Sequence, residues 1–165
     1  MFGIKTREQR IRALLIFFMV ALGISGITAI PLQWEIGILN QLFGPVSSFG
    51  AVFPAFGYWI GFVHDGLLDT FTHYPFLAYG TDWLAFAHVV IAVAFIGPLR
   101  DPVKNIWVIE FGMIACALII PWTLIFGALR DIPFFWRLVD MSFGVIGVLP
   151  LWFVRSEILK ITVEG

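Results

Sequence analysis

Charged residues are scarce in this chain: they make up 13% of its 165 residues, whereas soluble domains carry about 25%. Hydrophobic residues make up 60%. This deficit of charge, together with long apolar runs, excludes an ordinary soluble domain and predicts an integral membrane protein. The net charge of −1 leaves no basic footprint for nucleic acid, so we expect no nucleic-acid partner.

Cysteine is almost absent, and several signatures of catalysis and cofactor binding are missing altogether. Cys116 is the only cysteine, which excludes a disulfide within the chain. There is no C-x-x-C-H motif, so c-type haem is excluded, and no G-x-S-x-G, Walker or H-E-x-x-H motif is present. The sequence also lacks a lipidation motif and an internal repeat, and no motif in it indicates a particular reaction.

What the chain does have is four apolar runs long enough to cross a bilayer, at residues 11–30, 81–99, 106–128 and 134–154. The first run has 20 residues, which makes a helix of about 30 Å. Because the apolar core of a signal peptide has only about 7–15 residues, we expect this run to be a retained transmembrane helix. Short connectors follow the second and third runs and predict antiparallel neighbours.

Residues 31–80 are ambiguous, because the apolar segment Phe49–Val63 could be a fifth span, a re-entrant segment or an interfacial helix. Cytoplasmic loops carry an excess of lysine and arginine. If Phe49–Val63 crosses, six of these cations lie inside and four outside; if it does not, eight lie inside and two outside. The second split favours four spans with both termini in the cytoplasm. Residues 31–80 then form an extracytoplasmic cap.

The predicted fold is therefore an all-α integral membrane protein, with one domain over residues 1–165. It is an antiparallel four-helix transmembrane bundle with a short helical extracytoplasmic or re-entrant cap between spans 1 and 2. We expect it in the bacterial inner (plasma) membrane.

Burying a polar side chain inside a membrane span costs free energy, so each one indicates a structural or functional role. His88 and Asp140 each lie seven residues from the predicted outer end of a helix, about 10 Å below the outer surface. Arg137 lies one turn above Asp140, where the two side chains can pair and neutralise each other. His88 is expected to bond to a neighbouring helix. We predict an outward-facing polar pocket built from Ser25, Thr28, His88, Arg137 and Asp140.

One face of the fourth span continues from this pair. Gly144, Gly147 and Leu151 follow at steps of three and four residues. Glycines on a membrane helix let another backbone approach closely, so this stripe should face the bundle interior.

The stretch from Gly61 to His88 holds all three histidines and three of the six aspartates, but no lysine or arginine. Within it, Asp65, Asp69 and His73 are spaced four residues apart, and His64 precedes them. Helical histidines and acids at this spacing can bind zinc. The pattern fits no complete metal signature, so His64, Asp65, Asp69 and His73 are only metal candidates.

Two further chemical interpretations involve His88. It could ligate a b-type haem together with His64, or work with Asp140 in general acid–base catalysis. We expect no cofactor, and we expect a non-enzymatic subunit or binding protein whose pocket takes a partner, lipid or cofactor. Its partners would be the bilayer and other membrane subunits or a second copy of itself. The alternative is a membrane-embedded enzyme that uses His88 and Asp140 on a lipid-soluble substrate.

Overall fold

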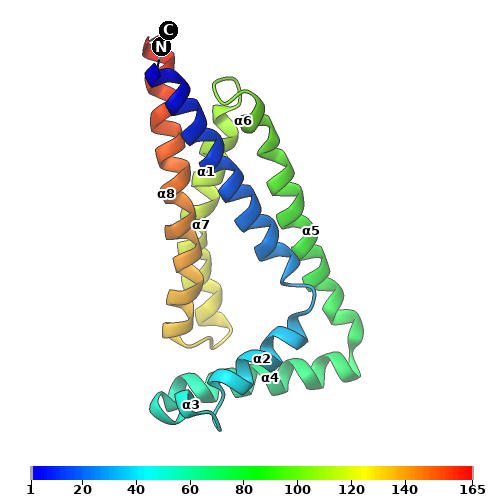
Figure 1. The fold of residues 1–165 in the computed structure, drawn as a ribbon. Coiled ribbons are helices and arrows are strands. Elements are labelled where there is room, and N and C mark those ends of the chain that lie inside the picture. Colours follow the sequence, from blue (N-terminus) through cyan, green and yellow to red (C-terminus); the bar gives the residue numbers. More distant parts are fainter. Residues whose placement is uncertain (1, 165) are drawn as a thin grey trace. The chain divides into compact units, whose positions relative to one another are not determined.

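The computed structural model describes residues 2–164, and the side chains of residues 7–163. Over these residues every regular element is a helix, as the sequence predicts (Figure 1). The elements in chain order are α1 (Phe2–Ile27), α2 (Leu32–Phe43), α3 (Ser48–Val52), α4 (Pro54–His73), the 3-10 turn η1 (Pro75–Leu77), α5 (Ala78–Ala94), α6 (Ile96–Arg100), α7 (Ile106–Leu129) and α8 (Phe134–Glu164).

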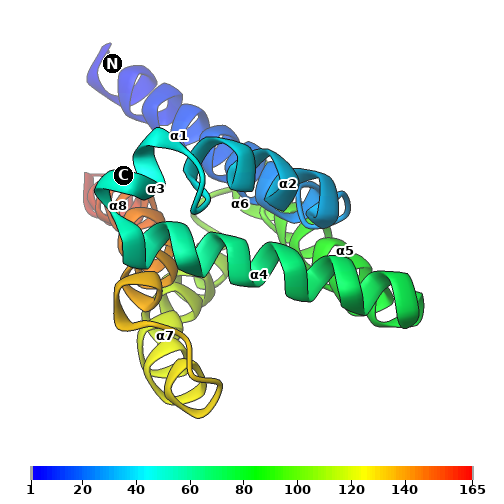
Figure 2. The same cartoon turned by 90° about the horizontal axis from the view of Figure 1, so that it is seen from below.

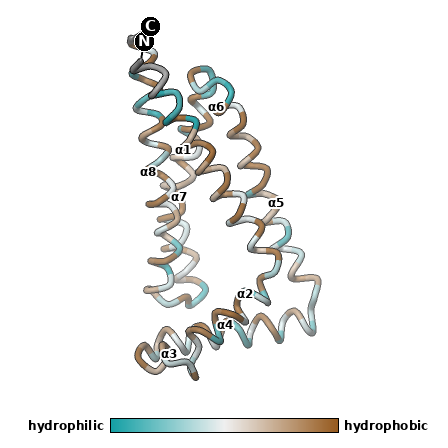
Figure 3. Tube along the Cα trace, viewed as in Figure 1, coloured by the Kyte–Doolittle hydropathy of each residue, from teal (hydrophilic) through white to brown (hydrophobic). Residues whose placement is uncertain are grey.

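Four stretches are long and apolar enough to cross a membrane, which confirms the predicted number of long transmembrane helices. They are Arg7–Ile27, Pro75–Arg100, Ile106–Leu129 and Phe134–Val163. Shorter helices lie between the first two, as the predicted cap requires. Figure 3 shows hydrophobic residues along most of α5 and α7, and hydrophilic ones at the turn between α6 and α7.

Helix α8, the fourth predicted span, runs ten residues beyond its predicted end at Val154, because its charged residues form ion pairs with other residues. Arg155 Nε donates to Glu110 Oε1 of α7 at 2.8 Å. Glu157 accepts from Lys160 Nζ at 2.5 Å, and it lies 3.6 Å from Arg7 Nε of α1. The charges that look like the end of a span are therefore neutralised within the fold.

The chain forms two compact units, which we name after their principal helices. The α7–α8 unit comprises Met1–Leu22 and Ile91–Gly165, and the α2–α4 unit comprises Gly23–Val90. Helices α1 and α5 each contribute residues to both units.

In the α7–α8 unit, α7 and α8 pack as an antiparallel pair with glycines in the seam. A side chain at Gly144 would overlap the backbone carbonyl oxygen of Cys116, and one at Gly147 would lie 3.0 Å from the Cys116 sulfur. Leu151 is fully buried. The glycine stripe on α8 thus faces a neighbouring helix, as predicted.

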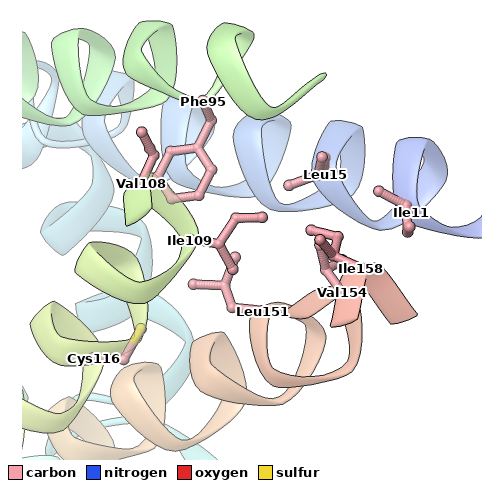
Figure 4. Close-up of a cluster of buried hydrophobic side chains, with 9 residues drawn as sticks. All are labelled: Ile11, Leu15, Phe95, Val108, Ile109, Cys116, Leu151, Val154 and Ile158. Atoms are coloured by element: carbon pink, nitrogen blue, oxygen red, sulfur yellow. The ribbon is translucent and has the colours of Figure 1, made fainter. Parts of the chain in front are cut away.

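Helix α1 lies antiparallel to α8 in this unit. Its residues Ile11 and Leu15 join a buried cluster with Leu151, Val154 and Ile158 of α8 (Figure 4). Phe95, at the junction of α5 and α6, and residues of α7 complete the cluster. Because Arg7 lies beside Glu157, the beginning of α1 and the end of α8 are at the same end of this unit.

The α2–α4 unit depends on close backbone approach between short helices. A side chain at Gly50 would overlap the carbonyl oxygen of Gly44, and one at Gly57 would lie 2.9 Å from the Gly50 Cα. Ser47 caps α3, since its Oγ accepts the Gly50 N–H at 2.9 Å. Figure 2 shows α2 and α4 lying alongside each other, in agreement with their many contacts.

Helix α4 is longer than predicted, because it continues past Val63 to His73 and has 20 residues. Proline cannot donate a backbone hydrogen bond and restricts the residue before it, so the helix ends where Tyr74 precedes Pro75. A helix of this length reaches about 30 Å. It is not among the four apolar stretches, since its second half carries two histidines and two aspartates.

Candidate functional site

A cleft on α4, in the α2–α4 unit, combines aromatic residues with a charged one. It has a volume of about 390 Å³ and is lined by Pro45, Tyr58, Gly61, Phe62, Asp65 and Gly66. Two of these residues are glycines without side chains, which leaves the space open. Pro45 closes one wall, and its Cδ lies 3.0 Å from the position that a side chain at Gly61 would take.

The aromatic wall of this α4 cleft is a stacked pair. The rings of Tyr58 and Phe62 have centroids 6.2 Å apart and planes inclined by 20°. Tyr58 is 68% exposed and Phe62 is 59% exposed, so both rings are largely accessible. Trp59 also stacks on Phe62, with centroids 5.8 Å apart. Such a surface can hold an apolar side chain or a cation over its rings.

The metal candidates of α4 form two separate histidine–aspartate pairs. His64 Nδ1 lies 2.9 Å from Asp65 Oδ1, and His73 Nδ1 lies 3.1 Å from Asp69 Oδ1. No group of three or more histidine, cysteine or acidic side chains suited to a metal ion occurs in the part of the chain that the structure describes. Of the four candidates, only Asp65 lines the α4 cleft, where it supplies a carboxylate beside the aromatic wall.

His88 bonds within its own helix, and not to a neighbouring one as expected. Its Nδ1 lies 2.8 Å from the carbonyl oxygen of Leu84, one turn earlier in α5. The neighbouring helix supplies packing instead: a side chain at Gly26 of α1 would lie 2.5 Å from the His88 Cβ and 3.0 Å from the Ala85 carbonyl oxygen. The glycine lets α1 and α5 approach closely at His88, and the local carbonyl bonds the Nδ1 of the ring.

We expect His88→Gln to change the free energy of unfolding by less than about 1 kcal/mol, because glutamine keeps the Cβ that packs on Gly26 and keeps a donor. Denaturation of the detergent-solubilised protein measures this. Gly26→Val, which places methyl groups against His88, should be clearly more destabilising. A His88→Gln loss as large as that of Gly26→Val would contradict the packing role.

Two other predicted pocket residues, Ser25 and Thr28, lie at the C-terminal end of α1. Thr28 Oγ1 donates to the carbonyl oxygen of Ser25 at 3.0 Å, which ties the threonine to its own turn. Ser25, Thr28 and His88 all belong to the α2–α4 unit.

Arg137 and Asp140 belong to the α7–α8 unit, and there the expected pairing between them was wrong. Arg137 Nε donates to the carbonyl oxygen of Ile132 at 2.7 Å, and its side chain lies across Gly127. Among residues 7–163 no ion pair joins Arg137 to Asp140. The backbone reverses at Asp131, where φ is 54°, and the turn offers the guanidinium a nearer acceptor than the carboxylate.

The predicted pocket thus draws three residues from one unit and two from the other. It stays a prediction, as does acid–base work by His88 with Asp140. The α4 cleft was missed. Its signal in the sequence is the spacing of Gly57 and Gly61, since a G-x-x-x-G pattern marks a surface of close helix approach, with aromatic residues beside it.

Comparisons with known proteins do not assign this chain to a family. No protein-family model matches the chain, and neither the curated proteins nor the solved structures include a significant match.

Proposed function

We propose that this chain is a small, non-enzymatic subunit of a membrane assembly, which binds a partner through the α4 cleft. The observation that carries the proposal is the exposed Tyr58–Phe62 stack on a backbone held by glycines. Aromatic residues are enriched at protein interfaces, and they dominate binding where they stand on a rigid scaffold.

The chemistry of the α4 cleft suits another membrane protein or a second copy of this chain. Its aromatic wall accepts an apolar side chain, and Asp65 at its edge accepts a hydrogen bond from a polar or cationic one. His64 bonds to the same carboxylate and leaves it mostly exposed, with 81% of the Asp65 side chain accessible. The partner would therefore present a basic or amide-bearing residue next to an apolar one.

The proposed orientation places both termini in the cytoplasm and residues 31–80 outside, in a bacterial-type plasma membrane. The antiparallel arrangement of α1 and α8 supports it, because it brings the first and last spans' charged ends together. The scarcity of cations elsewhere supports it too: residues 13–99 contain no lysine or arginine.

The test removes the aromatic wall. In a mild detergent, the unaltered protein is expected to elute with its partner, or as an oligomer, above the 18.6 kDa mass of one chain. Tyr58→Ala combined with Phe62→Ala should weaken that association about 30-fold or more, since interface aromatics contribute about 2 kcal/mol or more when they are hot spots.

The matched control is Tyr79→Ala combined with Trp83→Ala. These residues form another exposed aromatic pair, with centroids 5.9 Å apart, on the apolar helix α5. Size-exclusion chromatography with light scattering reads both variants. Equal loss of association in the two variants, or an unaltered protein that elutes as one chain, would refute the role of the α4 cleft.

A further inference from the structure

A second groove lies in the α7–α8 unit, between α1 and α8, and it differs from the α4 cleft in chemistry. It has a volume of about 430 Å³ and is lined by Arg10, Ala13, Leu14, Pro150 and Phe153. Four of its five lining residues are apolar. The fifth, Arg10, lies close to the beginning of the apolar stretch Arg7–Ile27.

The sequence explains why a groove forms at this place and runs along the helices. Arg10, Ala13 and Leu14 share one face of α1, at steps of three and four residues. Pro150 and Phe153 share a face of α8 in the same way. Ala13 and Pro150 are short side chains, so they leave room that a leucine or phenylalanine would fill. The buried cluster around Leu15 and Leu151 closes the seam behind them.

Among the described residues Arg10 is in no direct ion pair, while neighbouring cations at this end of the unit are paired; its charge reaches Glu157 only at longer range. Lys160 pairs with Glu157, Arg155 with Glu110, and Lys104 with Asp101. Arg10 forms no hydrogen bond or ion pair with any residue of the described range 7–163. A cation above an apolar groove at the end of a span fits the headgroup and the chain of a lipid.

We propose that this groove binds an anionic phospholipid, with the phosphate group on Arg10 and one acyl chain along Ala13, Leu14, Pro150 and Phe153. Lipid tails are as apolar as these side chains, so moving an acyl chain from the bilayer into the groove adds little preference for one lipid over another. The headgroup supplies the selectivity. The groove should therefore discriminate by headgroup charge and hardly at all by chain length.

A nearby cleft shows why Arg10 is singled out. This neighbouring cleft, which is separate from the Arg10 groove, contains Arg12 and Arg100, together with Glu8 and Asp101. The Lys104 backbone N–H donates to Asp101 and its ammonium lies 3.2 Å away, which lowers the pKa of that carboxyl and keeps it ionised. Two acids line the cleft of Arg12 and Arg100, whereas no acid lines the groove of Arg10, so an incoming anion gains less at Arg12 and Arg100. Arg12 lies two residues from Arg10 and carries the same charge, which makes it a matched control.

The experiment is native mass spectrometry of the purified full chain in mild detergent, with equimolar phosphatidylglycerol and phosphatidylcholine of identical acyl chains. The unaltered protein should retain more phosphatidylglycerol. Arg10→Gln should lower the bound ratio of the two lipids about fivefold, because one cation near a membrane surface contributes about that factor. Arg12→Gln should leave the ratio nearly unchanged, and Arg10→Lys should keep most of the preference.

A steric variant tests the groove separately from the charge. Ala13→Phe fills the space without altering any charge, so it should lower the retention of both lipids. Circular dichroism and the melting temperature establish that each variant is folded. Equal effects of Arg10→Gln and Arg12→Gln would show a diffuse basic surface only. That result, or an unaltered protein without preference for phosphatidylglycerol, would overturn the proposal.

Discussion

Replacing Phe95 with alanine is expected to lower the free energy of unfolding by about 3 kcal/mol. Phe95 is fully buried, at 0% exposure, and its ring lies 4.8 Å from that of Phe18. It also occupies the space above Gly112, where a side chain would come within 2.7 Å of the ring. Truncating a buried phenylalanine costs about 3–5 kcal/mol. We expect the lower end of this range, because lipid or detergent already solvates apolar groups in the unfolded state. The cost that remains is mainly that of the cavity left in the core.

Denaturation in mixed micelles of a mild detergent and sodium dodecyl sulfate, followed by circular dichroism, measures this loss. Phe86→Ala is the matched control, because Phe86 lies on α5, which ends one residue before Phe95, and is 57% exposed. We expect its cost to stay below about 0.5 kcal/mol. Comparable losses in the two variants would mean that Phe95 does not hold the core of the α7–α8 unit.

The second large effect is expected for Gly144→Val, with a loss of about 2 kcal/mol. A side chain at this position overlaps the backbone carbonyl oxygen of Cys116, and a backbone atom cannot rotate out of the way. Overpacking of a close seam costs about 1–3 kcal/mol. The two helices must separate, which also loosens the contact between Gly147 and the Cys116 sulfur.

This prediction has an independent readout in the chain's one cysteine. Cys116 is buried, so separation of α7 and α8 should speed its alkylation by N-ethylmaleimide. Gly23→Val is the control, because a side chain at Gly23 meets nothing within 4 Å. Unchanged stability together with unchanged alkylation in Gly144→Val would show that the seam tolerates bulk and is not closely packed.

Much of the fold follows from local physics, and the sequence predicts that part well. A bilayer about 30 Å thick requires about 20 apolar residues per helix, and this rule alone located four long helices. Steps of three and four residues placed Gly144, Gly147 and Leu151 on one face, and that face does meet a neighbouring helix. Composition was enough to exclude a soluble domain.

Contacts between distant parts of the chain decided the remainder. Helix α8 continues past Val154 because Arg155 meets Glu110 and Glu157 meets Arg7, partners that are 45 residues away in the first case and on the first helix in the second. No local sequence pattern predicts such ion pairs, so charged residues after an apolar run look like the end of a span.

The candidate site shows the same division between local pattern and tertiary contact. Sequence spacing brought Arg137 within reach of Asp140, yet the backbone reversal at Asp131 offered the Ile132 carbonyl instead. The α4 cleft exists because Pro45, on the loop before α3, closes against Gly61 sixteen positions later. The sequence by itself determined the class of protein and its spans, because these depend on length and hydrophobicity. Only the tertiary structure decided which polar groups pair and where a cleft opens, because both depend on which backbones approach each other.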